Sequence, residues 1–182
     1  MVLAILPAVT LWPFLFTYTP AEAVRKIYPG NFFAEMPELA QRLETVTSPA
    51  KRVFVFGAEP ELLFYARRTS ATRYIFLFPL YGPYGNAHER QIEAAAEIER
   101  AEPSAAVYVP NLLFFVSGTD QYFTKWGLSY MQTNFYVDTW LKADQSGGAQ
   151  LVKASSDIKY DSLSAGEQLI GAILVRNPTW GP

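Results

Sequence analysis

The amino-acid sequence predicts an α/β fold, a three-layer Rossmann-like sandwich whose mostly parallel sheet has about five strands. Three observations predict it. Residues 53–56 form an unbroken apolar run that ends at Gly57, which is typical of a strand buried on both faces. A Glu-Pro-Glu segment at 59–61 then opens a helix, with proline near its first position and carboxylates near its positive end. Residues 74–78 form a second β-prone run, and two buried strands joined through a helix imply a parallel pair with a right-handed crossover.

An N-terminal hydrophobic segment, residues 1–20, precedes a single α/β domain expected over residues 21–182. The segment carries no charge, and its length is just sufficient to span a hydrocarbon core of about 30 Å as a helix. Its aromatic residues cluster toward its end, as an interfacial belt would: Trp12, Phe14, Phe16 and Tyr18. We interpret it as a membrane anchor. The alternatives are a buried or interfacial arm, and a cleaved signal peptide that would lack its basic n-region.

Hydrophobic spacing and turn residues predict the next elements. Apolar residues at positions 36, 39, 40 and 43 recur at i, i+3, i+4 and i+7, which predicts an amphipathic helix that packs on the sheet. Small and apolar residues sharing one face predict another helix, which Pro103 ends. The expected order is a helix at 21–28, the helix from 36, a strand at 52–56, the helix from 59, a strand at 74–78, a loop at 81–86, a helix at 87–102 and a strand at 105–109.

The C-terminal third combines an aromatic-rich segment with two β-prone runs. Asp120 is a suitable N-cap for the aromatic segment, which we expect to be helical with a potential break at Gly127. The two β-prone runs are expected to form an antiparallel pair at one edge of the sheet. The expected order is a loop at 112–119, the helical region at 120–142, a turn at 144–148, a strand at 149–154, a polar connector at 155–167 and a strand at 168–176.

Composition limits the classes of function. Of 182 residues, 50% are hydrophobic and only 18% are charged, so we expect part of the surface to meet a membrane or a partner. The net charge of -2 offers no electrostatic footprint for nucleic acid. The chain has no cysteine and a single histidine, so we expect no metal site, no cysteine nucleophile and no cofactor.

Three ordered blocks of the sequence carry a family resemblance: YPGNFF at 28–33, VFGAEPELLFYARRTSATRYIF at 55–76 and ERQIEAAAEIERAEPSAAVYV at 89–109. They resemble the soluble C-terminal domain of bacterial membrane glycosyltransferases of the protein O-mannosyltransferase/aminoarabinose-transferase type, over roughly residues 12–176. The resemblance implies the fold and a periplasmic or other extracytoplasmic location. The resemblance also implies that in this family catalysis takes place in a multi-pass membrane part. This sequence has no segment that resembles that part.

Ligands of parallel sheets usually bind beyond the carboxyl ends of the strands. Around this rim, the candidate ligand- or phosphate-binding residues are Glu59, Arg67, Arg68, Arg73, Tyr81 and His88. The three guanidinium groups could hold a phosphate or a carboxylate. Alternatively, they complement the dipole at the C-terminal end of a helix. Gly57 lies outside any G-x-G-x-x-G pattern and beside a carboxylate that would repel phosphate, so we interpret it as part of a strand-to-helix turn.

The sequence contains no pattern that supplies a complete set of catalytic residues. His88 lies in the first turn of a predicted helix, where we expect a surface or capping role, with a catalytic role as the alternative. No G-x-S-x-G occurs, so a serine hydrolase is not predicted either. We therefore assign no catalytic residue.

Aromatic residues between positions 122 and 140 exceed what one helix needs for its core. Tyrosine and tryptophan are the residues that anchor interfaces. We expect a contact surface made of Tyr84, Trp126, Tyr130, Tyr136 and Trp140. Ordinary packing and a sugar-binding platform are the alternatives.

Two hypotheses on function follow. The first is a non-catalytic, membrane-associated extracytoplasmic domain that positions a substrate, such as a lipid-linked sugar, for a membrane-protein partner or a parent transmembrane domain. The second is a structural or accessory subunit docked on a larger membrane protein complex, with glycosyltransferase function lost. An upstream reading frame that encodes membrane-spanning segments would favour the first hypothesis.

Overall fold

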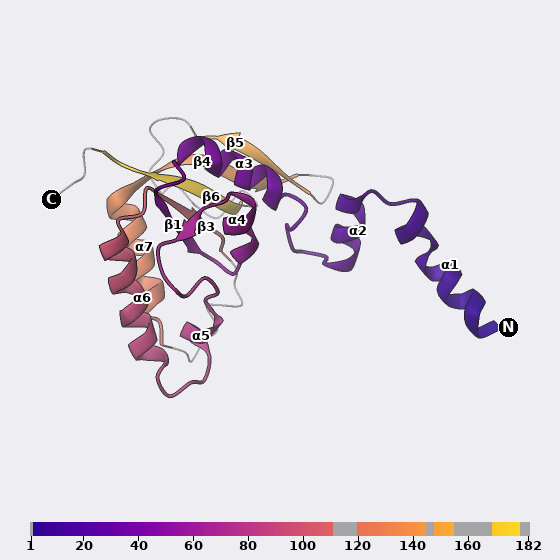
Figure 1. The fold of residues 1–182 in the computed structure, drawn as a ribbon, viewed down its shortest axis with the longest axis horizontal. Helices are drawn as coiled ribbons and strands as arrows, with labels where there is room; N and C mark the ends of the chain where they lie inside the picture. The colour runs from indigo at the N-terminus through magenta and orange to yellow at the C-terminus, as the bar shows by residue number, and fades with distance from the viewer. Residues whose placement is uncertain (1, 111–119, 145–147, 155–168, 179–182) are drawn as a thin grey trace.

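A computed structural model of the chain describes residues 2–110, 120–144, 148–154 and 169–178 (Figure 1). The loop expected at 112–119, most of the turn at 144–148 and the connector at 155–167 lie outside the described residues. The helices are α1 Val2–Phe16, α2 Pro20–Ile27, α3 Met36–Val46, α4 Pro60–Tyr65, α5 Phe78–Tyr81, α6 Ala87–Ala101 and α7 Tyr122–Asn134. The strands are β1 Arg52–Phe56, β2 Thr69–Ser70, β3 Ala105–Tyr108, β4 Phe135–Ala143, β5 Ala149–Lys153 and β6 Leu169–Arg176.

Over the described residues the sheet has six strands in the order β2-β1-β3-β6-β4-β5, which confirms an α/β fold. β1 runs parallel to β2 and β3, whereas the β3–β6, β6–β4 and β4–β5 pairs are antiparallel. The sheet is therefore mixed, and the expectation of a mostly parallel sheet was wrong. The parallel half contains β1 and β3 where the sequence predicted strands, and the antiparallel half is built from the C-terminal third.

Strand β1 supplies side chains to both faces of the sheet, as its unbroken apolar run predicted. Phe54 and Phe56 pack on one face with residues of α6 and α7, and Val53 and Val55 pack on the other with residues of α3 and α4. All four side chains are buried. The alternation is the two-residue period of a strand. Burial on both faces explains why this run lacks polar positions.

The strand expected at 74–78 was wrong. The strand that follows α4 and pairs in parallel with β1 is β2, which has only two residues, and the apolar run instead leads into the short helix α5. The carboxylate of Glu97 holds the backbone in a turn, because it accepts hydrogen bonds from the Thr72 hydroxyl at 2.7 Å and from the backbone N–H of Arg73 at 2.9 Å. Pro79 then occupies the first turn of α5. The apolar run is therefore exposed over much of its length and does not enter the sheet.

The aromatic segment changes from helix to strand, so the helical region expected to reach Lys142 was wrong. Helix α7 ends at Asn134, and the chain continues directly as β4. Residues 135–139 alternate between buried and more exposed positions, residues 139–141 are all buried, and the segment is rich in β-prone side chains, which favours a strand. The break expected at Gly127 does not occur, because this glycine lies within α7 where a Cβ would come 2.8 Å from the Phe56 ring.

The two C-terminal strands do not form an edge pair. β6 lies between β3 and β4 in the middle of the sheet, and β5 forms the edge beside β4. β6 is an apolar run buried over residues 170–174, as expected of a central strand. The expectation of an antiparallel edge pair was therefore wrong, because the buried run of β6 pairs with a strand on each side.

Helices α1 and α2 extend away from the sheet, and the N-terminus lies at the far end of this arm (Figure 1). Pro20 and a capping box between Thr19 and Glu22 start α2. Arg25 of α2 contacts Glu35, just before α3, with 2.5 Å between Nη2 and Oε1. None of the helices in the described ranges is long and apolar enough to cross a membrane.

Candidate functional site

The residues predicted at the strand-end rim do not form one site. At the end of β1, the Glu59 side chain folds back over Gly57 and accepts a hydrogen bond from the Ala58 N–H. A Cβ at position 57 would lie 2.2 Å from Glu59 Oε2, so a larger residue there would displace the Glu59 carboxylate. Burial raises the pKa of Glu59 to about 7. A carboxylate thus occupies the place that a phosphate would take, consistent with interpreting Gly57 as part of a structural turn.

The three predicted arginines separate from one another. Arg68 donates to the carbonyl oxygens of Glu44 and Thr47 at 3.0 and 2.7 Å, and thereby satisfies acceptors at the end of α3. Arg67 is exposed and adopts a left-handed backbone conformation, with φ of 50°. Arg73 points instead toward α6. Arg68 therefore caps the C-terminal end of α3, which is close to the alternative that the arginines complement a helix dipole.

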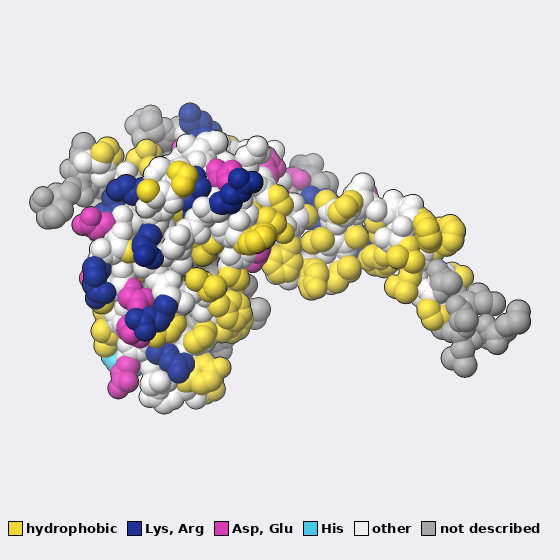
Figure 2. All heavy atoms as spheres, viewed as in Figure 1, with side chains coloured by type: hydrophobic (Ala, Val, Ile, Leu, Met, Phe, Trp, Pro, Cys, Tyr) yellow, Lys and Arg dark blue, Asp and Glu magenta, His cyan; other side chains and the backbone are white. Residues whose placement is uncertain are grey.

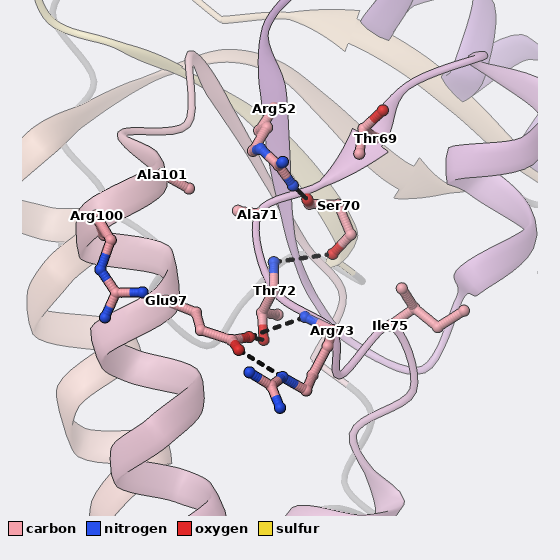
Figure 3. Close-up of a pocket in the computed structure, with 10 residues that line it drawn as sticks. All are labelled: Arg52, Thr69, Ser70, Ala71, Thr72, Arg73, Ile75, Glu97, Arg100 and Ala101. Atoms are coloured by element: carbon pink, nitrogen blue, oxygen red, sulfur yellow. Dashed lines mark hydrogen bonds and ion pairs between the residues drawn. The ribbon is translucent and has the colours of Figure 1, made fainter.

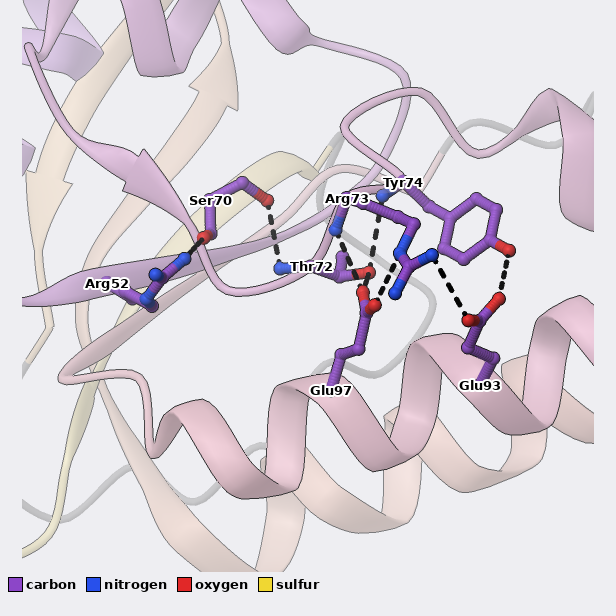
Figure 4. A network of polar contacts seen from close by, with 7 residues as sticks. All are labelled: Arg52, Ser70, Thr72, Arg73, Tyr74, Glu93 and Glu97. Atoms are coloured by element: carbon purple, nitrogen blue, oxygen red, sulfur yellow. Dashed lines mark hydrogen bonds and ion pairs between the residues drawn. The ribbon is translucent and has the colours of Figure 1, made fainter.

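Arg73 is part of a polar network between the 72–74 turn and α6 (Figure 4). Its Nε lies 2.5 Å from Glu97 Oε1 and its Nη1 lies 3.3 Å from Glu93 Oε1. The Tyr74 hydroxyl donates to the other oxygen of Glu93. Burial opposes ionisation of Glu97, but the hydrogen bonds from Thr72 and Arg73 outweigh it and lower the pKa of Glu97. This network fixes the turn to α6.

Tyr81 and His88 lie in different environments. Tyr81 is buried, and burial raises its pKa to about 12 although its oxygen accepts a hydrogen bond from Thr124. His88 is largely exposed, and its Nδ1 pairs with the Asp120 carboxylate. Asp120 also accepts a hydrogen bond from the backbone N–H of Tyr122 at 2.8 Å. This bond is the main cause that lowers the pKa of Asp120, and the hydrogen bond with His88 lowers it further. The pair orients an imidazole, but no hydroxyl of the described residues forms a hydrogen bond with its other nitrogen.

Most of the predicted aromatic contact surface packs within the domain. Trp140 is 5% exposed and belongs to the core. Trp126 and Tyr130 stack with ring centroids 5.0 Å apart, and their polar atoms contact Glu99 and Arg176. Tyr84 and Tyr136 are exposed on other elements. These aromatic rings are therefore divided between core packing and separate surface positions.

A different apolar surface is exposed, and sequence analysis missed it. Phe64, at the end of α4, is 79% exposed, and Ile75 and Phe76 before α5 are 50% and 43% exposed. We call the following set the apolar face: Phe33, Phe64, Tyr65, Ile75, Phe76 and Phe78. Figure 2 shows hydrophobic side chains gathered along one side of the molecule, from α1 over α2 to α4 and α5. The signal for it was the charge-free run at 74–78, which hydrophobicity alone placed in the sheet.

Comparison of the chain with models of protein families, with curated proteins and with solved structures finds no match. Over the described ranges, no group of three or more histidine or acidic side chains is arranged to hold a metal ion.

Proposed function

We propose that this chain is a non-catalytic α/β domain that docks on a lipid surface through α1 and the apolar face. The observation that carries the proposal is the continuity between an uncharged helix and an apolar surface of the folded domain (Figure 2). Contiguous exposed apolar patches larger than a few hundred Å² mark interaction sites in soluble domains. A lipid surface can meet both parts at once.

Helix α1 favours lipid over a folded protein partner as the occupant. Over residues 9–16, where the side chains of α1 are described, the apolar side chains are not confined to one stripe, and Val9, Leu15 and Phe16 are all more than 60% exposed. A helix that is hydrophobic all round requires an apolar environment on every side. Trp12, Phe14 and Tyr18 supply the aromatic side chains that favour the membrane–water boundary.

The resemblance to glycosyltransferase C-terminal domains supports the rest of the proposal. Helices on both faces of the sheet fit the three-layer, Rossmann-like sandwich expected for such a domain. We place the domain on the extracytoplasmic side of the membrane, where it would position a lipid-linked sugar for a membrane-protein partner or parent. In this role the domain binds and orients, and the partner supplies the chemistry.

The test is sedimentation of the full chain with neutral phosphatidylcholine vesicles. We expect Phe64→Ser with Phe76→Ser to lower the vesicle partition coefficient by about tenfold or more, since each buried aromatic ring contributes roughly 1.5–3 kcal/mol. Ile92→Ser removes an exposed apolar residue of α6 outside the apolar face and should leave partitioning within about twofold. Deletion of residues 1–19 should release the folded domain from the vesicles.

An accessory subunit docked on a membrane protein complex would give a different result. The full chain would then stay in the supernatant with pure lipid vesicles and sediment only with vesicles that contain the partner. That outcome would overturn the lipid-surface proposal and favour the accessory-subunit hypothesis.

A further inference from the structure

A hollow lies between the β2 edge of the sheet and the C-terminal half of α6 (Figure 3). Its volume is about 640 Å³, and it is open to solvent. Three arginines from separate parts of the chain line it, namely Arg52 at the start of β1, Arg73 in the turn after β2, and Arg100 in the last turn of α6. One carboxylate, that of Glu97, is in the lining as well. The lining is therefore predominantly cationic.

Among the residues that the structure describes, no carboxylate forms an ion pair with Arg52 or Arg100. Arg73 is committed to Glu97 and Glu93. Arg52 donates one Nη1 hydrogen bond to the Ser70 carbonyl at 2.9 Å, which uses only part of its guanidinium group. Arg100 makes no hydrogen bond or ion pair with the residues that the structure describes. Guanidinium groups with unused donors are the side chains best suited to phosphate oxygens.

Hydroxyl groups and an apolar wall complete the hollow. Thr69 and Ser70 of β2 contribute hydroxyls at its edge, and β2 is the edge strand of the sheet that the described residues form. Ile75 lines the side opposite Arg100 (Figure 3), and Ile75 also belongs to the apolar face. The hollow thus borders the surface that we propose to meet lipid. Its chemistry fits a ligand with an anionic head and an apolar chain.

We propose that this hollow binds a phosphate group, presented by the headgroup of an anionic lipid at the membrane surface. The inference rests on the proposed function, because the docked apolar face brings the hollow to the depth of the headgroups. Arg52 and Arg100 contact the phosphate oxygens, the hydroxyls of β2 donate further hydrogen bonds, and Ile75 contacts the start of the acyl chain. Arg73 keeps the turn in place through Glu97.

The experiment compares the full chain on vesicles of phosphatidylcholine alone and of phosphatidylcholine with phosphatidic acid. Arg52→Gln with Arg100→Gln should lower partitioning onto the phosphatidic acid vesicles by about 30-fold, since each basic side chain near an anionic surface contributes about 1 kcal/mol. The matched control, Lys51→Gln with Lys125→Gln, removes the same charge outside the hollow and should lower it less than about threefold. Both arginines are exposed, so unchanged circular dichroism is expected.

The outcomes separate the two proposals. If the arginine and lysine variants lose vesicle partitioning equally, general surface charge explains the effect, and the proposed phosphate site is overturned. Binding to both kinds of vesicle that depends on Phe64 and Phe76, but not on Arg52 and Arg100, would overturn the site and leave the proposed function standing. If the full chain does not bind vesicles of phosphatidylcholine alone, the proposed function itself is overturned. Inorganic phosphate that binds the full chain without vesicles, and not the arginine variant, would assign the site to free phosphate and overturn the lipid source.

Discussion

At Glu59, burial and a neighbouring glycine act on one carboxylate. The side chain folds over Gly57 and is held by the Ala58 N–H, so it cannot turn out to water without losing this bond. Burial raises its pKa from 4.5 to about 7, and the nearby Glu61 carboxylate adds to the rise. The pKa of Glu61 is itself raised by burial. Two adjacent carboxylates at the start of α4 therefore resist ionisation.

We predict that stability falls between pH 4.5 and about 7 because of Glu59. The folded state holds this proton to a higher pH than the unfolded chain, so the unfolded state is favoured as pH rises through that interval. The shift corresponds to about 3 kcal/mol at pH 8. Glu59→Gln should remove most of this loss, as measured by urea unfolding at pH 5 and 8. Glu38→Gln, at an exposed position of α3, is the control. An unchanged slope in the Glu59 variant would contradict the prediction.

Gly127 illustrates a residue whose role depends on a distant strand. We predict that Gly127→Ala destabilises the domain by about 1–3 kcal/mol, because the added Cβ would lie 2.8 Å from the Phe56 ring and overpack the core. The higher helix propensity of alanine offsets about 1 kcal/mol at most. Thermal unfolding measures the change. Gly85→Ala, where a Cβ meets nothing within 4 Å, should be nearly neutral. A more stable Gly127→Ala would show that Phe56 moves aside freely.

At the scale of elements, one side chain of α6 determines where an apolar segment goes. Glu97 binds both the Thr72 hydroxyl and the Arg73 backbone, and this turn directs residues 74–78 away from the sheet. The segment then exposes Ile75 and Phe76. The hydrogen bonds of a single carboxylate thus separate a buried strand from an exposed part of the apolar face.

We predict that Glu97→Ala frees this turn. Loss of the hydrogen bonds should destabilise the domain by about 1–3 kcal/mol and should raise the hydrogen-exchange rate of the Arg73 amide. Amide exchange followed by mass spectrometry over residues 70–78 measures it. The control is Glu89→Ala, an exposed position in the first turn of the same helix. Equal protection of the Arg73 amide in both variants would mean that Glu97 does not hold the turn.

Hydrophobic spacing and turn residues in the sequence predicted those helices and strands that are determined by nearby residues. The buried run of β1, the spacing of α3 and the proline-terminated α6 are confirmed. The errors involve long-range contacts. Residues 74–78 have the composition of a strand, but the turn held by Glu97 on the distant helix α6 directs them away from the sheet. The place of β6 between β3 and β4 depends on pairing with residues 27 to 70 positions earlier in the chain, and no local pattern in the sequence specifies these partners.

The candidate residues show the same division. Sequence placed three arginines near one rim, because all three lie around the end of a predicted helix and strand. In the fold, Arg68 binds carbonyl oxygens at the end of α3, and Arg73 pairs with Glu97 of α6. Arg52 and Arg100, which are far apart in the sequence, both line the hollow. No spacing in the sequence links Arg52 to Arg100. The apolar face was hidden for the same reason, since exposure is a property of the assembled fold.

At the scale of the whole molecule, the arm is joined to the domain by a buried contact. Glu35, whose side chain is 4% exposed, pairs with Arg25 of α2. We predict that Arg25→Ala destabilises the domain by about 1–3 kcal/mol, since a buried carboxylate loses its partner. Urea unfolding measures the loss. Arg25→Ala with Glu35→Gln should recover part of it, because no buried charge remains. A single variant as stable as wild type would show that the arm is not held by this pair.

The central claim is that the apolar face meets lipid, and the absence of cysteine from the chain allows a direct test. Phe76→Cys and Ile92→Cys each introduce one unique thiol, which is labelled with an environment-sensitive fluorophore and mixed with phosphatidylcholine vesicles. We predict a blue-shifted, brighter emission for the label at position 76 and no change at position 92. Water-like emission at position 76 in vesicle-bound protein would contradict the claim.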